Sequence, residues 1–338
     1  MNKRIYNILL ATILIAIVPG CGRSRRYFPR HTAPEHITVV RFDSALIAWG
    51  EQSDKVSIQA LTKAYPDFMP FYCEAILGVS AQDTDYLAQA LPMYLNDTLY
   101  GFQATNKVVE ETFRDFSQVS KPLDRAFGRI KYLYPEWPMP KLYTFVSGFN
   151  GNVLFMDDDM AVGLDMYLGS DYPYYNHVVY QYQKQTMRPE CIAADLTSAY
   201  LFKNIPYTST KQRLIDQMLY RGKVMYMLSV IMDDTPNYEI MGYTREQWDW
   251  AMKHERQVWN RIMDKRDLFK TEQLMLTGYL NDGPFTSEIS QEAPPRLGTW
   301  IGWRIAESYM AHHDQITLQQ LISEGDAEMI LRESYYRP

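Results

Sequence analysis

The chain has 338 residues, 46% of them hydrophobic and 14% aromatic, and it carries a formal net charge of −6 at pH 7. This length and apolar content suffice for one large folded domain or two smaller ones. The acidic balance argues against nucleic acid as a partner, because a protein that binds the phosphate backbone normally carries a basic surface.

The beginning of the chain has the form of a bacterial lipoprotein export signal. Lys3 and Arg4 precede a nearly continuous apolar run over residues 5–18, which is too short to span a bilayer as a mature helix. Cys21 follows a small residue at the end of this run, as in a lipobox. We therefore predict that residues 1–20 are a signal peptide and that Cys21 is acylated. The alternative is an ordinary signal peptide with an incidental cysteine.

Residues 21–36 are basic and contain Pro29 and Pro34, which predicts a flexible tether between a lipid anchor in the membrane and a folded domain. The basic side chains of this tether either lie against anionic lipid headgroups or form a solvated linker. The acidic stretch typical of surface-exported lipoproteins does not follow Cys21, so we expect a cell-envelope protein that faces the periplasm. A single domain is expected over residues 37–338.

The region before residue 141 is predicted to be mainly helical. Residues 37–42 form a predicted short edge strand, and a helix is expected from Asp43. Further along, apolar side chains recur at helical spacing, which indicates amphipathic helices with one buried face. Pro122 is expected in the first turn of the last helix, where its missing N–H is tolerated. These helices are predicted at residues 56–65, 68–77, 86–95, 108–116 and 122–134.

The densest strand signals fall in residues 141–175. Three runs of apolar, β-branched or alternating residues are separated by the glycine-containing segment 148–152 and by an acidic turn, residues 157–159. With long helices on either side, the predicted fold class is α+β, mainly helical, with a small antiparallel sheet as the floor on which the helices pack. The three antiparallel strands are predicted at residues 142–146, 153–156 and 161–168.

A tyrosine-rich loop over residues 172–182 is followed by further predicted helices. One opens at a proline and covers residues 189–202. A later segment, residues 298–310, is expected to form a buried helix with Trp300 and Trp303 in the core. Three helix starts carry the pattern of a capping box, at residues 209–212, 244–247 and 317–320.

The sequence contains no complete catalytic or metal-binding motif. His254 and Glu255 begin an HExxH pattern, but Val258 stands where the second histidine is required. Patterns of the GxSxG, P-loop and CxxC types are absent. The acidic turn at residues 157–159 has the ligand type for calcium but lacks the EF-hand spacing, so a solvated turn is favoured.

Two cysteines remain besides Cys21. An oxidising envelope compartment permits a disulfide between Cys73 and Cys191. The sequence does not bring the two within bonding distance. Two buried free thiols are therefore the favoured reading, with the disulfide as the alternative.

Several short segments together carry a family resemblance. They are Cys21, YPDF (65–68), YTFVSGFN (143–150), GLDMYLGSD (163–171), RPE (188–190), LIDQM (214–218), DTP (234–236), GYT (242–244), GPFT (283–286) and RLGTWIGW (296–303). In this order they resemble the gliding-motility lipoprotein GldB family of Bacteroidetes, over nearly the whole mature chain. The resemblance implies a cell-envelope lipoprotein tied to gliding and to the type IX secretion apparatus, with envelope proteins as partners. It implies no cofactor and no established enzymatic activity.

A second, fainter resemblance concerns the architecture. A small sheet followed by two consecutive helices is similar to the layout of gluzincin-type zinc peptidases. That alignment places Ala194 and Ser198 at the two histidine positions, Asp195 at the general base and Arg221 at the ligand glutamate. The analogy implies a degenerate zincin-like scaffold without metal ligands.

Polar residues are expected near the floor of the groove in such a scaffold, namely Asp165, Tyr167, Arg188, Glu190, Asp195 and Arg221. A structural role is favoured for them over a ligand site, with an Arg–carboxylate pair as a strut in place of a metal. The sequence thus favours a non-catalytic lipoprotein that binds envelope partners. The alternative is an envelope hydrolase that uses carboxylates such as Asp165, Glu190 or Asp195 in a tyrosine-rich cleft.

Overall fold

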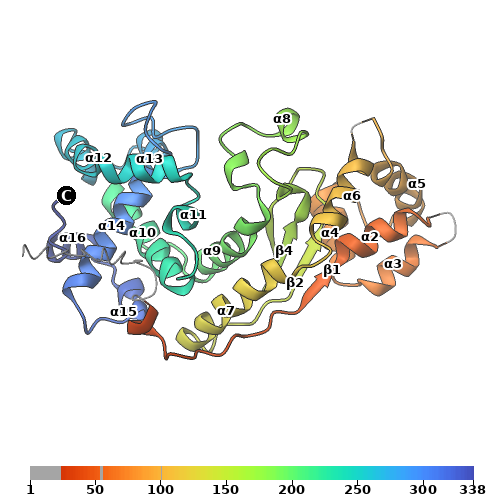
Figure 1. Cartoon of the computed structure of the whole chain (residues 1–338), viewed down its shortest axis with the longest axis horizontal. Coiled ribbons are helices and arrows are strands. Elements are labelled where there is room, and N and C mark those ends of the chain that lie inside the picture. Colours follow the sequence, from red (N-terminus) through yellow and green to blue (C-terminus); the bar gives the residue numbers. More distant parts are fainter. Residues whose placement is uncertain (1–23, 54–55, 100) are drawn as a thin grey trace, which may run out of the picture.

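Four short strands form a mixed sheet near the middle of an elongated, mainly helical molecule (Figure 1). The computed structural model of the chain describes residues 24–53, 56–99 and 101–338, so the predicted signal peptide and Cys21 lie outside the described residues. The strands lie in the order β1-β2-β4-β3. Their bounds are β1 (Val39–Arg41), β2 (Leu142–Phe145), β3 (Val153–Met156) and β4 (Asp159–Gly163).

The predicted edge strand before the first helix is present as β1, but the prediction of an all-antiparallel sheet is wrong. β1 and β4 both run parallel to β2, and only β3 is antiparallel to its neighbour β4. The cause lies in the connection after β2, which skips one strand position before β3 begins. The chain then turns back and places β4 in the vacant position, where it necessarily points the same way as β2.

The third predicted strand, residues 161–168, is also shorter than expected. β4 ends at Gly163, and a single 3₁₀ turn follows as η2 (Leu164–Met166). In this turn the buried Asp165 accepts hydrogen bonds from the backbone N–H groups of Ser147 (2.8 Å) and Phe149 (2.7 Å). Satisfying these two donors bends the chain out of the strand direction.

Helices between β1 and β2 gather toward one end of the molecule, and α7 (Ser117–Leu133) runs from there beside the sheet (Figure 1). The short helix α1 (Ser24–Tyr27) lies at the opposite end. The predicted helices of this region are present, but two differ clearly in their bounds. The helix expected at residues 108–116 begins at Phe102 and ends at Thr112. α7 begins earlier than expected, so that Pro122 lies inside it, in its second turn. The elements are α1 (Ser24–Tyr27), α2 (Phe42–Gly50), α3 (Ile58–Ala64), α4 (Phe68–Tyr72), a π-helical turn η1 (Cys73–Leu77), α5 (Thr84–Leu95), α6 (Phe102–Thr112) and α7 (Ser117–Leu133).

Helices after the sheet form the other end of the molecule (Figure 1). The tyrosine-rich segment is not a plain loop, since it contains one short helix, α8. The elements are α8 (Tyr175–Val178), η3 (Lys184–Thr186), η4 (Pro189–Cys191), α9 (Ile192–Asn204), α10 (Leu214–Ile231), α11 (Asn237–Met241), α12 (Arg245–Asp264), η5 (Asp267–Phe269), α13 (Gln273–Leu280), α14 (Leu297–His312), α15 (Leu318–Ser323) and α16 (Ala327–Glu333).

Two of the three predicted capping boxes are present. The hydroxyls of Thr244 and Thr317 accept from the third residue of α12 and α15, whose glutamine side chains bond back to the cap. The prediction at residues 209–212 is wrong, because α10 begins only at Leu214 and its N-cap, Arg213, makes no side-chain cap bond. Instead, the first N–H of α10 donates to the carbonyl oxygen of Lys270 (2.9 Å), a tertiary contact.

α10 and α14 cross at two glycines and form the centre of the C-terminal group of helices. A Cβ atom on Gly222 would overlap the backbone of Gly302, and a Cβ on Gly302 would overlap the carbonyl of Met218. The two backbones therefore approach more closely than any side chain permits. Trp300 and Trp303 are buried at this crossing, as predicted, and Trp248 packs against both rings.

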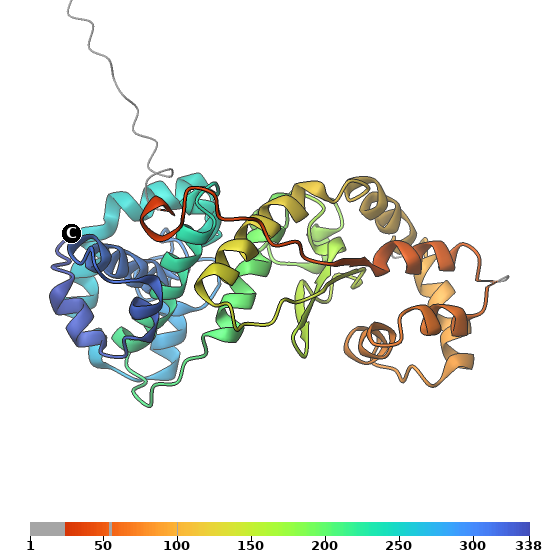
Figure 2. The same ribbon diagram turned by 90° about the horizontal axis from the view of Figure 1, so that it is seen from below.

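The described part of the predicted tether, from Ser24 to His36, lies along the domain instead of extending from it as a free linker. Figure 2 shows this segment passing from β1 along α7 to the end of the C-terminal helices. Phe28 is buried, and the guanidinium of Arg26 donates to the last carbonyls of α14, at Met310 (2.7 Å) and His313 (2.6 Å). Gly128 of α7 provides the space in which the backbone of residues 33 and 34 lies.

Two further observations bear on the predictions. Cys73 and Cys191 are both buried and unbonded, so the pair forms no disulfide. Within the described ranges, none of the helices combines the length and the apolar character needed to cross a bilayer.

Candidate functional site

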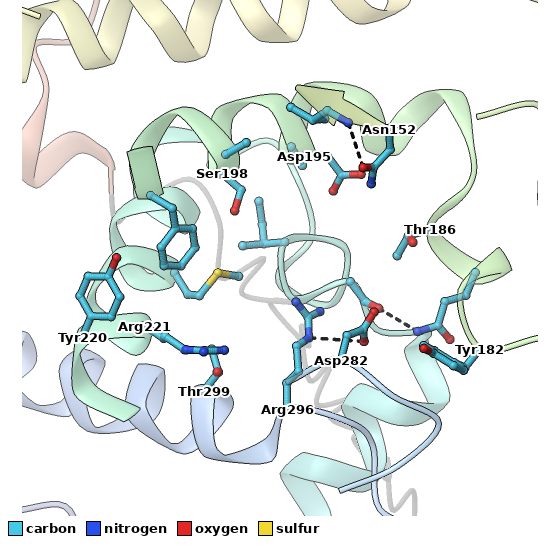
Figure 3. Close-up of a pocket in the computed structure, with 18 residues that line it drawn as sticks. Asn152, Tyr182, Thr186, Asp195, Ser198, Tyr220, Arg221, Asp282, Arg296 and Thr299 are labelled. Atoms are coloured by element: carbon cyan, nitrogen blue, oxygen red, sulfur yellow. Dashed lines mark hydrogen bonds and ion pairs between the residues drawn. The ribbon is translucent and has the colours of Figure 1, made fainter. Parts of the chain in front are cut away.

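A cavity of about 670 Å³ lies where α9, α10 and the start of α14 meet the edge strand β3 (Figure 3). Its volume falls in the range of small-molecule sites. Side chains from segments far apart in the sequence converge on it. The polar lining consists of Asn152, Tyr182, Gln185, Thr186, Asp195, Ser198, Tyr220, Arg221, Asp282, Arg296 and Thr299, and the apolar lining includes Phe202, Met225 and Ile240.

The wall formed by α9 carries one carboxylate. Ala194 and Asp195 each neighbour Ser198 on the helix surface, because they precede it by four and three residues. Asp195 accepts a hydrogen bond from the hydroxyl of the buried Tyr167 (2.9 Å). Burial raises the pKa of Asp195 to about 6, although the Tyr167 hydrogen bond and the charge of Arg296 oppose the rise. This carboxyl therefore titrates close to neutral pH.

Tyr167 supports Asp195 as a hydrogen-bond donor. Burial, together with the nearby carboxylate, raises the pKa of Tyr167 well above its ordinary value. The phenol thus keeps its proton at neutral pH. It orients Asp195 from behind the cavity wall and is not itself part of the lining.

The opposite wall carries two arginines. Arg221 of α10 donates to the carbonyl oxygen of Leu280 (2.7 Å) and to the side-chain oxygen of Asn281 (3.3 Å). Arg296, at the N-cap of α14, donates through Nη2 to the carbonyl oxygen of Met241. Burial, and to a smaller degree the positive charge of Arg296, lowers the pKa of Arg221.

Two polar atoms of this wall have no hydrogen-bond partner among the residues that the structure describes, the Nε of Arg296 and the Oγ1 of Thr299. Thr299 is 4% exposed. The carboxylate of Asp282 lies 3.9 Å from the Nε of Arg296, beyond hydrogen-bond distance, and is largely exposed. Buried polar atoms are normally satisfied, so these two atoms are candidates for contact with a ligand group.

The predicted groove residues divide into two groups. Asp195 and Arg221 line the cavity together with Ala194 and Ser198, so the zincin-like alignment brings its four positions to one place. No group of three or more His, Cys, Asp or Glu side chains that could hold a metal ion occurs in the described part of the chain.

The other predicted groove residues lie outside the lining. Asp165 is buried and holds the turn after β2 through three hydrogen bonds from Ser147 and Phe149. Arg188 donates to the carbonyl oxygen of Gln185 (3.0 Å), and Glu190 is exposed. The strut between an arginine and a carboxylate stays a prediction; among the described lining residues, Arg296 and Asp282 form a loose ion pair at 3.9 Å.

Asp282, Arg296 and Thr299 are among the cavity residues that were not identified from the sequence. The only sequence signal was that Arg296 and Thr299 fall in the RLGTWIGW segment. This segment contributed to the family resemblance, but its residues did not by themselves suggest a chemical role. Arg296 also has a left-handed backbone with φ of 57°. A non-glycine residue in that conformation is uncommon and often occurs at functional sites.

A second cavity of about 480 Å³ is apolar and lies on another part of the surface. It includes the exposed Leu99 and the left-handed Phe149. Its described lining holds no charged pair and shares no residue with the lining of the first cavity. Its lining is Leu99, Phe102, Gly148, Phe149, Pro173, Tyr174, His177 and Val178.

Comparison with known proteins gives one match. A family model described as gliding motility protein GldB matches residues 29–338, which is nearly the whole chain. No curated protein and no solved structure matches the chain significantly.

Proposed function

The chain belongs to the gliding motility protein GldB family, and from this premise we propose that it is a lipid-anchored envelope protein that acts by binding other envelope components, without catalysis. Family membership relates the protein to gliding motility and to a cell-envelope location. The proposal adds anchoring through Cys21, orientation toward the periplasm and partners in the gliding or type IX secretion machinery.

The composition of the cavity is the observation that carries the non-catalytic role. Asp195 faces it beside Ala194 and Ser198, and the opposite wall contributes Arg221 and Arg296. Nucleophilic catalysis requires a nucleophile hydrogen-bonded to a base. Asp195 instead accepts a hydrogen bond from the phenol of Tyr167, which keeps its proton at neutral pH. Arginines on one wall suit recognition of a ligand group better than proton transfer.

Genetic complementation tests the proposed role. Deletion of the gene in its own bacterium is expected to reduce colony spreading or type IX secretion. Chains with Asp195→Asn or Ser198→Ala should restore both, because neither side chain takes part in bond cleavage. A deletion strain that spreads and secretes normally would contradict the proposed role.

Anchoring is tested separately by Cys21→Ser. Without the thiol no lipid can be attached, so the protein should move from the membrane fraction to the soluble fraction. Labelling with radioactive palmitate should likewise be lost. Membrane retention equal to that of the wild type would show that Cys21 is not the anchor.

One observation favours the alternative of an envelope hydrolase. The pKa of Asp195, raised to about 6 by burial, suits a general acid or base that works near neutral pH. In that case Asp195→Asn would fail to complement while the protein accumulated to normal levels. The complementation experiment therefore separates the two functions.

A further inference from the structure

We propose that the central cavity binds an organic anion, whose carboxylate or phosphate group lies between Arg221, Arg296 and Thr299. This inference rests on the proposed binding role and deepens it by naming the chemical class of ligand. Figure 3 shows these three residues on one side of the cavity, with Asp195 and Ser198 on the other.

Within the described residues, neither arginine of this wall has a carboxylate at hydrogen-bond distance. Arg41, Arg129 and Arg213 each form a short hydrogen bond to a carboxylate, at 2.7, 2.5 and 2.7 Å. In contrast, Arg221 donates to a carbonyl and an amide oxygen, and Arg296 donates to a carbonyl and has Asp282 at 3.9 Å from its Nε. Guanidinium donors that face a cavity without a bonded carboxylate are suited to an oxyanion from outside.

The buried hydroxyl of Thr299 is an independent sign of a ligand. Its Oγ1 lines the cavity and has no partner within the described structure, although the residue is 4% exposed. Leaving such a group unpaired is unfavourable. An oxyanion that accepts from this hydroxyl and from Nε of Arg296 would satisfy both unpartnered atoms with one group.

The start of α14 adds positive potential at the same place. This 16-residue helix has Arg296 at its N-cap, Thr299 in its first turn and no acidic residue in that turn. The N-terminal end of a helix carries partial positive charge and favours an anion. The negative groups of the cavity are Asp195, which lies across from the arginines, and Asp282, which is 60% exposed.

The remaining lining indicates what is attached to the anionic group. Phe202, Met225 and Ile240 provide an apolar surface next to the arginines, so the ligand should carry a hydrocarbon or apolar side-chain portion. A carboxylate and a phosphate monoester both fit this description. The experiment below distinguishes the two sources.

Calorimetric titration of the full-length chain in detergent tests the proposal. The probes are hexanoate, hexyl phosphate and inorganic phosphate, with neutral hexanamide as the matched control. We expect saturable binding of hexanoate or hexyl phosphate, and no binding of hexanamide. Tighter binding of hexanoate would identify a carboxylate ligand, and tighter binding of either phosphate a phosphate ligand.

Three variants assign the binding to this wall. Arg221→Gln and Arg296→Gln should each weaken binding about tenfold, since each removes a charge-assisted hydrogen bond. Thr299→Val should weaken it severalfold while leaving the melting temperature of the free protein unchanged or higher, because the hydroxyl it removes has no partner. Arg188→Gln removes a half-buried arginine outside the cavity and should bind like the wild type.

Two results would overturn the proposal. One is the absence of saturable binding for all three anions up to about 10 mM. The other is binding that Arg221→Gln and Thr299→Val leave unchanged in proteins that melt normally. Neither result affects membrane fractionation or complementation of the deletion strain, so failure of the anion site and failure of the proposed envelope role are distinguishable.

Discussion

Asp165 and Asp195 are two carboxylates whose surroundings differ in the number of donors. Asp165 accepts from two backbone N–H groups and the hydroxyl of Ser147, whereas Asp195 accepts one hydrogen bond within the described residues, from Tyr167. Burial raises the pKa of both. Because Asp165 accepts three hydrogen bonds, its role is to hold the turn after β2. The carboxylate of Asp195, in contrast, lines the cavity.

Replacement of Asp195 by asparagine should change the pH dependence of stability. Because burial raises the pKa of Asp195 from 3.8 to about 6, the folded chain keeps a proton that the unfolded chain has already lost between these values. The stabilisation of the folded state by this proton is fully present below about pH 4 and is lost as the pH rises through about 6. At pH 8, Asp195→Asn should therefore be more stable than the wild type by about 2–3 kcal/mol.

Urea denaturation at pH 8 and at pH 4 measures this difference, which should nearly vanish at the lower pH. Asp282→Asn, which removes an exposed carboxylate of the same cavity, should show no such pH dependence. Lower stability of Asp195→Asn at pH 8 would mean that Tyr167 and Arg296 stabilise the ionised carboxylate by more than burial costs it.

Trp300 provides a test of packing at a single residue. It is fully buried, and its indole N–H has no partner in the described structure, so truncation removes packing without breaking a hydrogen bond. Trp300→Ala should lower the free energy of unfolding by about 3–5 kcal/mol. Tyr180→Ala, at a residue 72% exposed, should have little effect. A loss below about 1 kcal/mol for Trp300→Ala would show that this face is not part of the core.

At the scale of elements, the crossing of α10 and α14 sets the width of the cavity. α10 contributes Arg221 to one wall, and the start of α14 contributes Arg296 and Thr299. Gly222 and Gly302 let the backbones of the two helices come into contact. On α14 this contact lies after Arg296 and Thr299, on the side toward the C-terminal end of the helix. Any side chain at the crossing must therefore separate the helices or tilt them, because interiors are close-packed.

Gly302→Ala tests this dependence. Helix propensity alone would make the substitution favourable by about 1 kcal/mol, so a loss of stability must come from the overlap with the carbonyl of Met218. We expect destabilisation of about 1–3 kcal/mol in urea melts, and weaker anion binding. Gly325→Ala, where a Cβ would meet nothing, is the control. Equal stability of the two variants would mean that the crossing tolerates a methyl group.

At the scale of the whole molecule, the segment that follows the proposed anchor residue is docked at the C-terminal group of helices. The chain from Cys21 to Arg26 spans at most about 18 Å, and Arg26 bonds the last carbonyls of α14. If Cys21 carries the proposed lipid, this end of α14 would be the one nearer the membrane. The cavity lies at the other end of α14, about 24 Å away along the 16 residues of this helix.

Gly128→Ala tests the docking of this segment. A methyl group at that position would overlap the carbonyl of Ala33, so residues 29–36 should leave their place on α7. Trypsin should then cut after Arg30 severalfold faster than in the wild type, while cleavage sites elsewhere keep their rates. An unchanged cleavage rate would show that the segment adapts without leaving α7.

The sequence by itself determined the features that depend on neighbouring residues. Periodic apolar positions located most helices, the turn signals around β3 located the strands, and two capping boxes marked the starts of α12 and α15. The alternation of apolar residues and the helical repeat are local properties of the chain, so they can be recognised without the partners. The short motifs, taken together, likewise indicated the GldB family, and the GldB family model matches the chain.

Tertiary structure decided what depends on contacts between distant segments. The parallel pairing of β1, β2 and β4 arises because β4 fills a position between two strands that precede it, and strand order leaves no mark on local periodicity. The cavity likewise joins Asp195 of α9 to Arg296 of α14, which only the packing of α9, α10 and α14 brings together. Local patterns of apolar residues show which face of a helix or strand is buried. The pairing of strands, and the meeting of distant side chains in a cavity, depend on which other element packs against that face.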